Sequence, residues 1–386
     1  EKSLTESVVK ATGVSAGANE TQVQLRELER ESETYKNLYQ TFLQRYQEAV
    51  QQQSFPVTEA RVITKASPSS SPSHPKKLLL LAVFIFIGGT IGCAIGAFRE
   101  FRDRFFRTGD QIRDSLGLEF LGIAPIIANT GAVVDEQHRL DSLTVRKTSA
   151  VSNYVIDHPL SAFAETMRSG KIAADLSFPG EACKIIGVTS TLPGEGKSTI
   201  SINFAQLLAS QGARTVLIDA DLRNPGATRA MGLHAQKGLL ETLLEGQDPR
   251  ANLLRDPRTN LRFLPAVIRH RVPHSSELLA SLAMQDMLRT LSSISDYIIL
   301  DLPPLGPVVD ARAIASRVDG FLFVVEWGGP ARRVVNQVLS SEPRIEQKCI
   351  GVVLNKVDQG KMKLYQMYGS SEYYSASYAK YYQEGA

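Results

Sequence analysis

The feature that most constrains the fold of this chain is a short glycine-containing turn that joins an apolar strand to a helix. The strand is expected at 185–188, the helix opens at 197, and the turn lies in the run TSTLPGEGKST at 189–199. Such a turn aims several backbone N–H groups, and the positive end of the helix dipole, at one point. In a phosphate-binding loop of this kind the Lys197 ammonium reaches the β- and γ-phosphates and the Ser198 hydroxyl binds Mg²⁺. The sequence therefore predicts a site for a nucleoside triphosphate.

The loop departs from the standard pattern G-x-x-x-x-G-K-[ST] at one place, because Thr191 stands where the pattern has its first glycine. An ordinary strand–helix turn rich in small residues is the alternative interpretation. The flanking elements, and two acidic motifs farther along the chain, favour the phosphate loop.

Those acidic motifs are two apolar strands that end in aspartates. The first, at 216–218, runs into Asp219 and Asp221, and the second, at 297–300, runs into Asp301. The i, i+2 spacing places the first two carboxylates at the carboxyl edge of their strand, and Asp301 is placed to hold Mg²⁺ directly or through water. A single aspartate at a strand end could simply cap a turn. Three of them, together with the phosphate loop, favour a metal and nucleotide site.

Apolar strands and helical stretches alternate from about residue 151 onward. The alternation predicts an α/β fold of the P-loop NTPase type, in which a parallel sheet carries helices on both faces and ligands bind at the carboxyl ends of the strands. Strands are expected at 185–188, 215–218, 262–265, 297–300, 320–325 and 349–354, and helices at 160–176, 197–210, 276–292, 310–317 and 331–340.

An uncharged stretch of 21 residues at 78–98 is long enough to span a bilayer as a helix. Two lysines precede it and five arginines follow it by residue 113, so the positive-inside rule places its C-terminal side in the cytoplasm. Gly88, Gly92 and Gly96 recur every four residues, which fits either close packing on another helix or the ordinary glycine tolerance of membrane helices.

The segments before this stretch differ from one another. Apolar residues at 21–53 keep a 3,4 spacing, which predicts either a coiled coil or an amphipathic helix packed on another domain. Prolines and serines at 54–77 predict an extended linker. The chain begins at Glu1 without a methionine or a signal segment, so we expect the C-terminal part of a longer protein.

Composition narrows the range of partners. The net charge of +3 is close to neutral and gives no reason to expect a nucleic-acid partner. The three cysteines show no paired spacing, which argues against a disulfide framework or a zinc site.

The phosphate loop with Pro193, the strand ending in Asp219 and Asp221, and the Asp301-Leu302-Pro303-Pro304 motif together resemble the bacterial tyrosine kinases of exopolysaccharide synthesis. The linker and apolar helix resemble the end of a polysaccharide chain-length determinant domain. The resemblance implies an N-terminally truncated inner-membrane protein with five parts: the end of a periplasmic domain with its linker at 1–77, a transmembrane helix at 78–98, a juxtamembrane connector at 99–150, a cytoplasmic kinase domain at 151–363 and a flexible tail at 364–386.

The resemblance also implies roles for individual residues. Lys197, Asp219 and Asp221 would be catalytic, with Asp219 orienting or deprotonating the attacking tyrosine, and Ser198, Asp221 and Asp301 would hold the metal. Nucleotide binding would involve Gly194, Glu195, Gly196, Lys197, Ser198, Thr199, Arg223 and Asn355, the last of these near the adenine.

The resemblance further predicts a ring-assembly motif on the first helix of the kinase domain. The family's Glu-x-x-Arg-x-x-Arg pattern is read here as Glu165, Arg168 and Lys171, which share one side of a helix. Lysine lacks the planar fork of arginine, which predicts a weaker contact at the last position. A solvated charged face is the alternative interpretation.

The C-terminal segment is rich in tyrosine and serine and contains no Val or Ile after residue 364, so it buries little aliphatic surface. A docked terminal helix with an aromatic stripe is one interpretation, and a flexible cluster of phosphoacceptors is the other. The phosphoacceptor candidates are Tyr365, Tyr368, Tyr373, Tyr374, Tyr378, Tyr381 and Tyr382.

These observations predict an ATP- and Mg²⁺-dependent tyrosine autokinase that regulates polysaccharide length or export. The implied partners are further copies of the chain in a ring, phosphorylated in trans, the polysaccharide polymerase and export machinery, a tyrosine phosphatase and the membrane. A nucleotide-switch ATPase and a non-catalytic scaffold that sets polymer length are the alternatives. A signature lysine of partition-type ATPases is absent, because Leu192 stands at its position.

Overall fold

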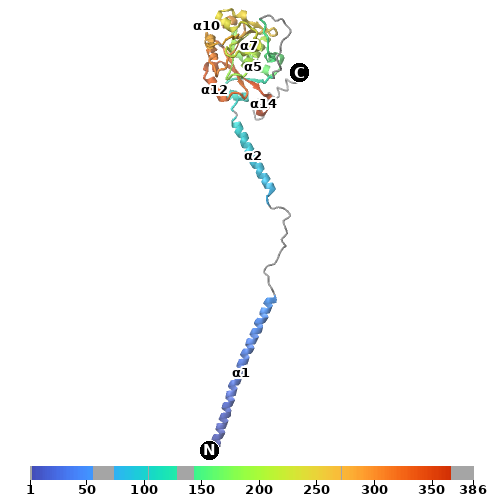
Figure 1. Cartoon of the computed structure of the whole chain (residues 1–386), viewed down its shortest axis with the longest axis vertical. Helices are drawn as coiled ribbons and strands as arrows, with labels where there is room; N and C mark the ends of the chain where they lie inside the picture. Colours follow the sequence, from blue (N-terminus) through green and yellow to red (C-terminus); the bar gives the residue numbers. More distant parts are fainter. Residues whose placement is uncertain (1, 55–73, 103, 128–142, 271, 367–386) are drawn as a thin grey trace. The chain divides into compact units, whose positions relative to one another are not determined.

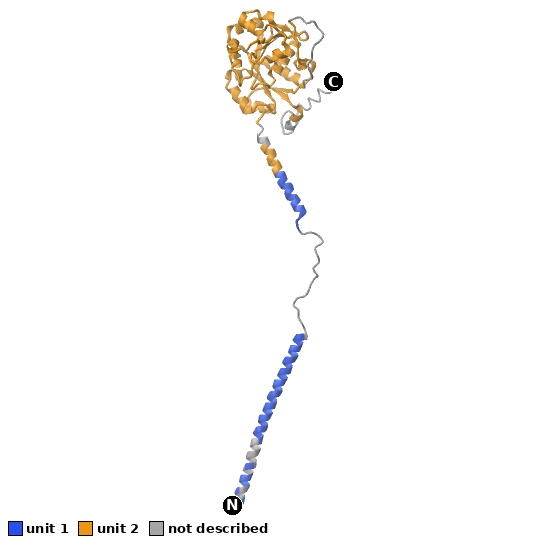
Figure 2. Ribbon diagram, viewed as in Figure 1, with its two compact units in different colours: residues 1–90 blue, residues 91–386 orange. Residues whose placement is uncertain are grey.

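The computed structural model describes residues 2–54, 74–102, 104–127, 143–270 and 272–366 (Figure 1). The chain divides into two compact units, residues 1–90 and 91–386 (Figure 2). The first unit contains α1 (Lys2–Ser54), which includes the helix expected at 21–53. The described side chains of α1 are exposed, including Leu28 and Tyr39, so the choice between a coiled coil and a packed amphipathic helix stays open. The expected linker at 54–77 lies mostly outside the described residues.

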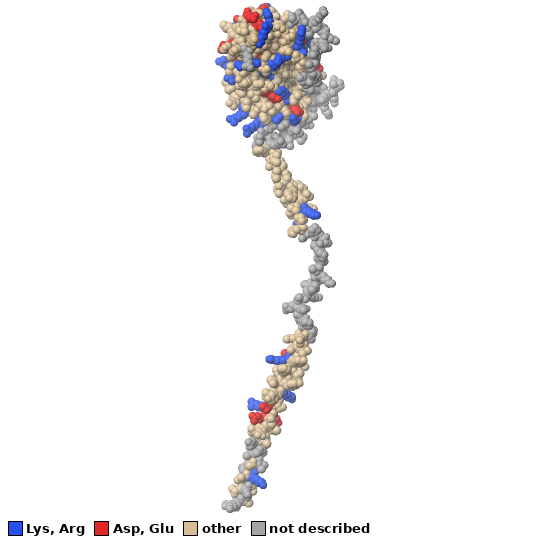
Figure 3. Space-filling view, viewed as in Figure 1, with Lys and Arg blue, Asp and Glu red and all other residues tan. Residues whose placement is uncertain are grey.

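Helix α2 (Lys77–Arg102) contains the predicted membrane span. Its segment Lys77–Phe98 has a mean hydropathy of 2.6, and none of it is buried against the rest of the chain. Space-filling representation shows a surface free of charge along most of this helix (Figure 3). Within the described residues, α2 is the one helix that is long and apolar enough to cross a membrane.

The second unit is built on an eight-stranded sheet in the order β1-β8-β7-β2-β6-β3-β5-β4. All neighbours are parallel except β4 and β5, which are antiparallel. The predicted parallel α/β sheet is confirmed, and the six expected strands are present with slightly different ends. The strands are β1 (Phe120–Pro125), β2 (Lys184–Ser190), β3 (Thr215–Asp219), β4 (Leu254–Arg255), β5 (Arg262–Leu264), β6 (Tyr297–Asp301), β7 (Gly320–Glu326) and β8 (Cys349–Val357).

Helices flank the sheet on both faces. The helix expected at 276–292 is two helices, because Ser281 leaves helical geometry and its hydroxyl accepts a hydrogen bond from the Met284 N–H as the N-cap of the second. The α-helices are α3 (Gly109–Leu116), α4 (Tyr154–Asp157), α5 (Ala162–Ser177), α6 (Lys197–Ser210), α7 (Gly226–Met231), α8 (Leu239–Glu245), α9 (Ser275–Ala280), α10 (Leu282–Ser292), α11 (Asp310–Ile314), α12 (Arg332–Ser340), α13 (Pro343–Gln347) and α14 (Gln359–Gln366). Short 3₁₀ turns lie at Ala150–Asn153, Pro249–Asn252 and Ala315–Arg317.

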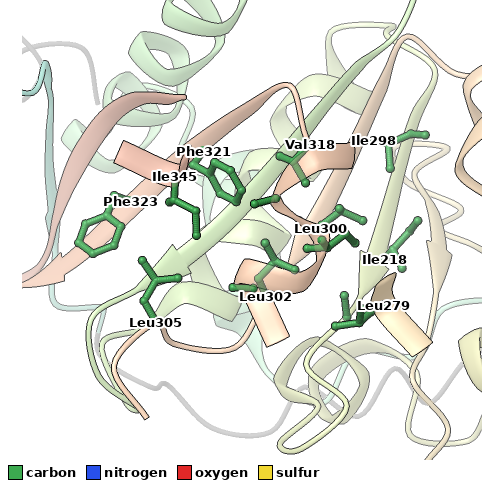
Figure 4. Close-up of a cluster of buried hydrophobic side chains, with 14 of the residues drawn as sticks. Ile218, Leu279, Ile298, Leu300, Leu302, Leu305, Val318, Phe321, Phe323 and Ile345 are labelled. Carbon is green, nitrogen blue, oxygen red and sulfur yellow. The ribbon is translucent and has the colours of Figure 1, made fainter. Parts of the chain in front are cut away.

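Two apolar cores lie on the two faces of the sheet. One core joins the sheet to α5 and α6, through side chains such as Phe163, Met167 and Phe204. The other joins it to α9–α13 and includes the side chains labelled in Figure 4. Because residues alternate between faces along a strand, Ile298 and Leu300 enter this second core while Ile299 between them enters the first.

The segment expected to be a connector, 99–150, contributes α3 and β1 to this unit. Strand β1 forms the sheet edge beside β8, and the Thr166 hydroxyl of α5 donates a hydrogen bond to its Ile123 carbonyl. Phe106 is fully buried in the second core. β1 was not predicted from the sequence because glycine and proline interrupt its apolar run, and β4 was not predicted because two residues give no periodic signal.

Candidate phosphate-binding site

Three neighbouring strands bring the predicted residues to one edge of the sheet. β6 lies between β2 and β3, and Asp219 is in register with Asp301. β2 ends at Ser190, immediately before the predicted phosphate loop. Since parallel strands end at the same edge, the loop and the aspartates meet at the carboxyl edge of the sheet, as expected.

The loop passes into α6 through Gly196. Its φ of 90° is left-handed, and a Cβ there would lie 2.2 Å from the Asn355 amide nitrogen, so this position requires glycine. The first N–H groups of a helix have no partner inside the helix, which leaves those of α6 available to a phosphate. Position 191 does not require glycine, because Thr191 is not among the described non-glycine residues with positive φ, which are Asn260 and Lys356. This explains how the loop tolerates its departure from the standard pattern.

Lys197 links the aspartates at the site. Its ammonium lies 2.8 Å from an oxygen of Asp221 and 3.7 Å from an oxygen of Asp301. All three side chains are buried. Burial lowers the pKa of Lys197, but the carboxylates of Asp301 and Asp221 outweigh it and raise the pKa above its ordinary value. The lysine therefore stays charged at neutral pH.

Asp301 has the features of a magnesium-supporting carboxylate. Its Oδ1 accepts a hydrogen bond of 3.1 Å from Ser201, and its buried Oδ2 has no hydrogen-bond partner among the described residues. Burial raises the pKa of Asp301, and Lys197 works against that rise. The described residues contain no cage of three acidic, His or Cys side chains. Mg²⁺ in nucleotide sites is typically held by one or two side chains and the phosphates, so Ser198, Asp221 and Asp301 fit it.

Asp219 is directed toward α7. One oxygen accepts hydrogen bonds of 2.7 Å from both the N–H and the hydroxyl of Thr228, and the other accepts one of 3.2 Å from the Asp221 N–H. The carboxyl group is fully buried. Burial, together with the charge of Asp301, raises the pKa of Asp219 to about 7. Both causes favour the protonated form of this carboxyl.

Two predicted nucleotide-binding residues make contacts within the chain. Arg223 donates two hydrogen bonds, of 3.0 and 3.1 Å, to the fully buried Asp310 of α11. The Asn355 amide donates a 2.8 Å hydrogen bond to the Glu195 carbonyl of the loop. Their predicted roles toward a nucleotide stay predictions.

Two clefts flank the loop and share Gly196, Ser198 and Thr199 in their walls. The first, of about 390 Å³, is lined also by Asn355, by the end of β1 and by the turn at 149–152. The second, of about 450 Å³, is lined also by Lys197, by Asp221 and by a wall of prolines. One cleft thus lies beside Asn355 and the other beside Lys197 and Asp221.

The predicted ring-assembly residues lie on α5, away from these clefts. Arg168 pairs with Glu165 and donates a 2.7 Å hydrogen bond to the Pro159 carbonyl, and Lys171 lies 2.7 Å from Asp175. All three side chains are partly exposed, and a role in assembly stays a prediction. Of the predicted phosphoacceptors, Tyr365 belongs to α14, and the other six lie outside the described residues.

Sequence reasoning missed several residues that shape the site. Thr228 holds Asp219, and Lys356 lies at the loop with a left-handed backbone. Prolines 303, 304 and 307 line the second cleft. Pro303 and Pro304 belong to the motif after Asp301 on which the family resemblance rests, but no role in the site was predicted for them, and no local pattern connects Thr228 or Lys356 to the site.

Comparison with known proteins agrees with this geometry. Residues 183–347 match a family model described as an AAA domain, and residues 20–101 match that of a G-rich (GNVR) domain described on a tyrosine kinase. The tyrosine-protein kinase CpsD of Streptococcus agalactiae is 38% identical over 192 residues, 49% of this chain and 82% of that protein. The chain belongs to the bacterial tyrosine kinase family.

Two further relatives match more of the chain. The succinoglycan biosynthesis transport protein ExoP of Rhizobium meliloti is 42% identical over 397 aligned positions, all of this chain and 50% of that protein. The tyrosine-protein kinase ptk of Acinetobacter johnsonii is 27% identical over 86% of this chain and 44% of that protein. The chain therefore spans about half the length of these two relatives.

Solved structures support the same fold. The chimerical protein CapA2B2 matches with a TM-score of 0.55 and 25% identity, over 65% of this chain and all of that one. The BceF tyrosine kinase domain matches with a TM-score of 0.52 and 26% identity, over 66% of this chain and all of that domain.

Proposed function

We propose that this chain is the membrane-anchored part of a protein-tyrosine autokinase that transfers the γ-phosphate of ATP to its own C-terminal tyrosines. The cluster of Lys197, Asp221 and Asp301 beside the phosphate loop is the observation that carries the proposal. It supplies a fixed positive charge and two carboxylates at one edge of the sheet, which is what phosphoryl transfer with Mg²⁺ requires. Membership of the tyrosine kinase family supports the choice of tyrosine as acceptor.

The side chains divide the chemistry between them. Lys197 and the N–H groups of α6 neutralise the phosphates, and Ser198, Asp221 and Asp301 are the groups that fit Mg²⁺, which supplies further charge neutralisation when bound. The bond from the γ-phosphorus to the bridging oxygen breaks as the bond to the tyrosine oxygen forms, and the phenol gives up its proton. Asp219 is the candidate that the family resemblance gives to orient the phenol or take that proton, although it is buried against Thr228 and is not among the residues that line the proline-lined cleft. The cleft beside Asn355 is the candidate for the nucleoside and the proline-lined cleft for the tyrosine.

We also propose the setting of this reaction. α2 crosses the inner membrane, with the sheet unit in the cytoplasm and the residues before 78 in the periplasm. The tail tyrosines are modified in trans within a ring of identical chains, in which Glu165, Arg168 and Lys171 contribute contacts. A phosphatase would reverse the modification. The name of the ExoP relative supports a role in the biosynthesis or transport of an exopolysaccharide, in contact with the polymerase and export machinery.

The test is mass spectrometry of the detergent-solubilised chain after incubation with Mg·ATP. We expect phosphate on the tail tyrosines of the parent and on none of the Lys197→Met, Asp219→Asn or sevenfold Tyr→Phe variants. Lys237→Met, at an exposed position, is the matched control and should behave as the parent. ATP hydrolysis without phosphotyrosine would instead identify a nucleotide switch, and neither activity would identify a scaffold.

A further inference from the structure

The phosphate loop contains a carboxylate that binds the protein's own backbone. Glu195 is 1% exposed, so it is closed off from solvent. Its Oε2 accepts a 2.6 Å hydrogen bond from the Leu192 N–H at the start of the loop, and its Oε1 accepts one of 3.1 Å from the Glu326 N–H at the end of β7. Both carboxylate oxygens are therefore engaged inside the protein, whereas the sequence predicted that Glu195 binds nucleotide.

Two residues at the end of β8 also donate hydrogen bonds to the phosphate loop. The Lys356 ammonium donates a hydrogen bond to the Gly194 carbonyl and lies 3.2 Å from the Glu326 carboxylate. The neighbouring Asn355 amide holds the Glu195 carbonyl at 2.8 Å. Lys356 has a φ of 56°, in the left-handed region that non-glycine residues seldom adopt. A backbone held in this region next to a ligand-binding loop indicates a positional requirement.

These contacts set the direction of the loop's N–H groups. In a trans peptide the carbonyl and the N–H of the same bond point in opposite directions. Since the carbonyls of Gly194 and Glu195 point toward β8, the N–H groups of Glu195 and Gly196 point away from β8. Successive N–H groups that converge in this way form an anion-binding concavity.

We propose that Glu195, Glu326 and Lys356 are positioning residues that hold the phosphate loop in its phosphate-binding shape. The inference rests on the proposed function, because it takes the loop to bind the phosphates of a nucleotide. The three residues act through the backbone of the loop, although Lys356 also lines the first cleft. They come from three separate elements, the loop, β7 and β8. They therefore connect the loop to the sheet at two points, the end of β7 and the end of β8.

A glutamate at position 195 fits this role better than a glutamine of the same shape. A carboxylate accepts hydrogen bonds at both oxygens, whereas glutamine offers one acceptor and one donor. The N–H groups of Leu192 and Glu326 stabilise the charged form of Glu195 against the burial that raises its pKa. In the Glu195→Gln variant, one of these N–H groups would face the side-chain NH2 of glutamine, which is a donor, and would lose its hydrogen-bond acceptor.

The test is the dissociation constant of Mg·ADP, measured by isothermal titration calorimetry on the full chain in detergent. We expect Glu195→Gln to weaken binding about tenfold, the effect of one buried N–H left without an acceptor. Glu241→Gln is the matched control, since Glu241 accepts a 2.8 Å hydrogen bond from the Gly238 N–H at the start of α8, outside both clefts. It should lower the melting temperature without changing the dissociation constant.

Lys356 provides an independent test, because its side chain is partly exposed. Lys356→Met removes the donor to Gly194 and should weaken Mg·ADP binding, while Lys356→Arg keeps a donor and should restore it. Unchanged affinity in both Glu195→Gln and Lys356→Met, or equal weakening in Lys356→Met and Lys356→Arg, would overturn the proposal. ADP binding needs no phosphoryl transfer, so the two proposals can fail separately. If the parent chain binds Mg·ADP but forms no phosphotyrosine, only the autokinase proposal is wrong. If the parent chain does not bind Mg·ADP, both the autokinase proposal and the proposal for the positioning residues are wrong.

Discussion

The ammonium of Lys197 lies 2.8 Å from the carboxylate of Asp221, with both side chains buried at the carboxyl edge of the sheet. They are 24 residues apart in the sequence, and the β2–β6–β3 order of strands brings them together. A buried charge pair of this kind is costly to break from one side, because the remaining charge is then left without compensation. The pair therefore links the stability of the unit to its proposed chemistry.

Lys197→Met should separate those two effects. We expect phosphotyrosine formation to fall by about 10³-fold, since one charged donor at the transferring phosphate is lost. The free energy of unfolding should fall by about 3 kcal/mol, because Asp221 is left unpaired. The double variant Lys197→Met/Asp221→Asn should recover part of the stability and none of the activity. Full activity of the single variant would exclude the proposed site.

Gly196→Ala should abolish nucleotide binding. The new Cβ would lie 2.2 Å from the Asn355 amide nitrogen, in addition to the strain of a left-handed φ. Gly180→Ala is the control, because Gly180 has a similar φ of 83° and no atom within 4 Å of the added carbon. Both variants should lose about 1 kcal/mol of stability from backbone strain, and only Gly196→Ala should lose Mg·ADP binding by calorimetry. Equal affinities would show that the contact with Asn355 is unimportant.

Residues 104–150 should be needed for a stable kinase unit. A fragment that begins at 151 lacks β1, the edge strand beside β8, and the buried Phe106. We expect a fragment of 104–386 to unfold in one cooperative transition and a fragment of 151–386 to unfold at a lower temperature or to aggregate through the exposed edge of β8. Differential scanning calorimetry of both fragments decides this, and identical melting temperatures would contradict it.

Asp175→Asn should have an effect on stability that depends on pH. Partial burial disfavours the charged Asp175, but hydrogen bonds from Lys171, Tyr297 and Lys184 outweigh it and lower its pKa to about 2. A carboxyl with a lowered pKa stabilises the folded state above its unfolded pKa near 3.8, and this contribution disappears as the pH falls through about 2. The variant should therefore melt below the parent at pH 7, and the difference should shrink between pH 4 and pH 2. A difference that stays constant over this range would point to lost packing.

Much of the fold could be predicted because its signals are local. The apolar run 297–300 and its terminal Asp301 indicate a strand and its end without knowledge of any partner, and the charge-free stretch 78–98 indicates a bilayer-length helix in the same way. Elements with weak local signals were missed. β1 forms because an edge beside β8 is open to it, and Ser281 splits one expected helix into two by capping the second.

The parallel sheet, the phosphate loop and the three aspartates follow from the sequence alone, because strand and loop patterns depend on neighbours a few residues apart. The contacts of each side chain follow from the packing of the folded chain. This packing directs Asp219 toward Thr228, pairs Arg223 with Asp310 and turns Glu195 inward, between Leu192 and Glu326. A buried polar group needs a hydrogen-bond partner, and that partner comes from whichever distant element the packing of the sheet brings within reach.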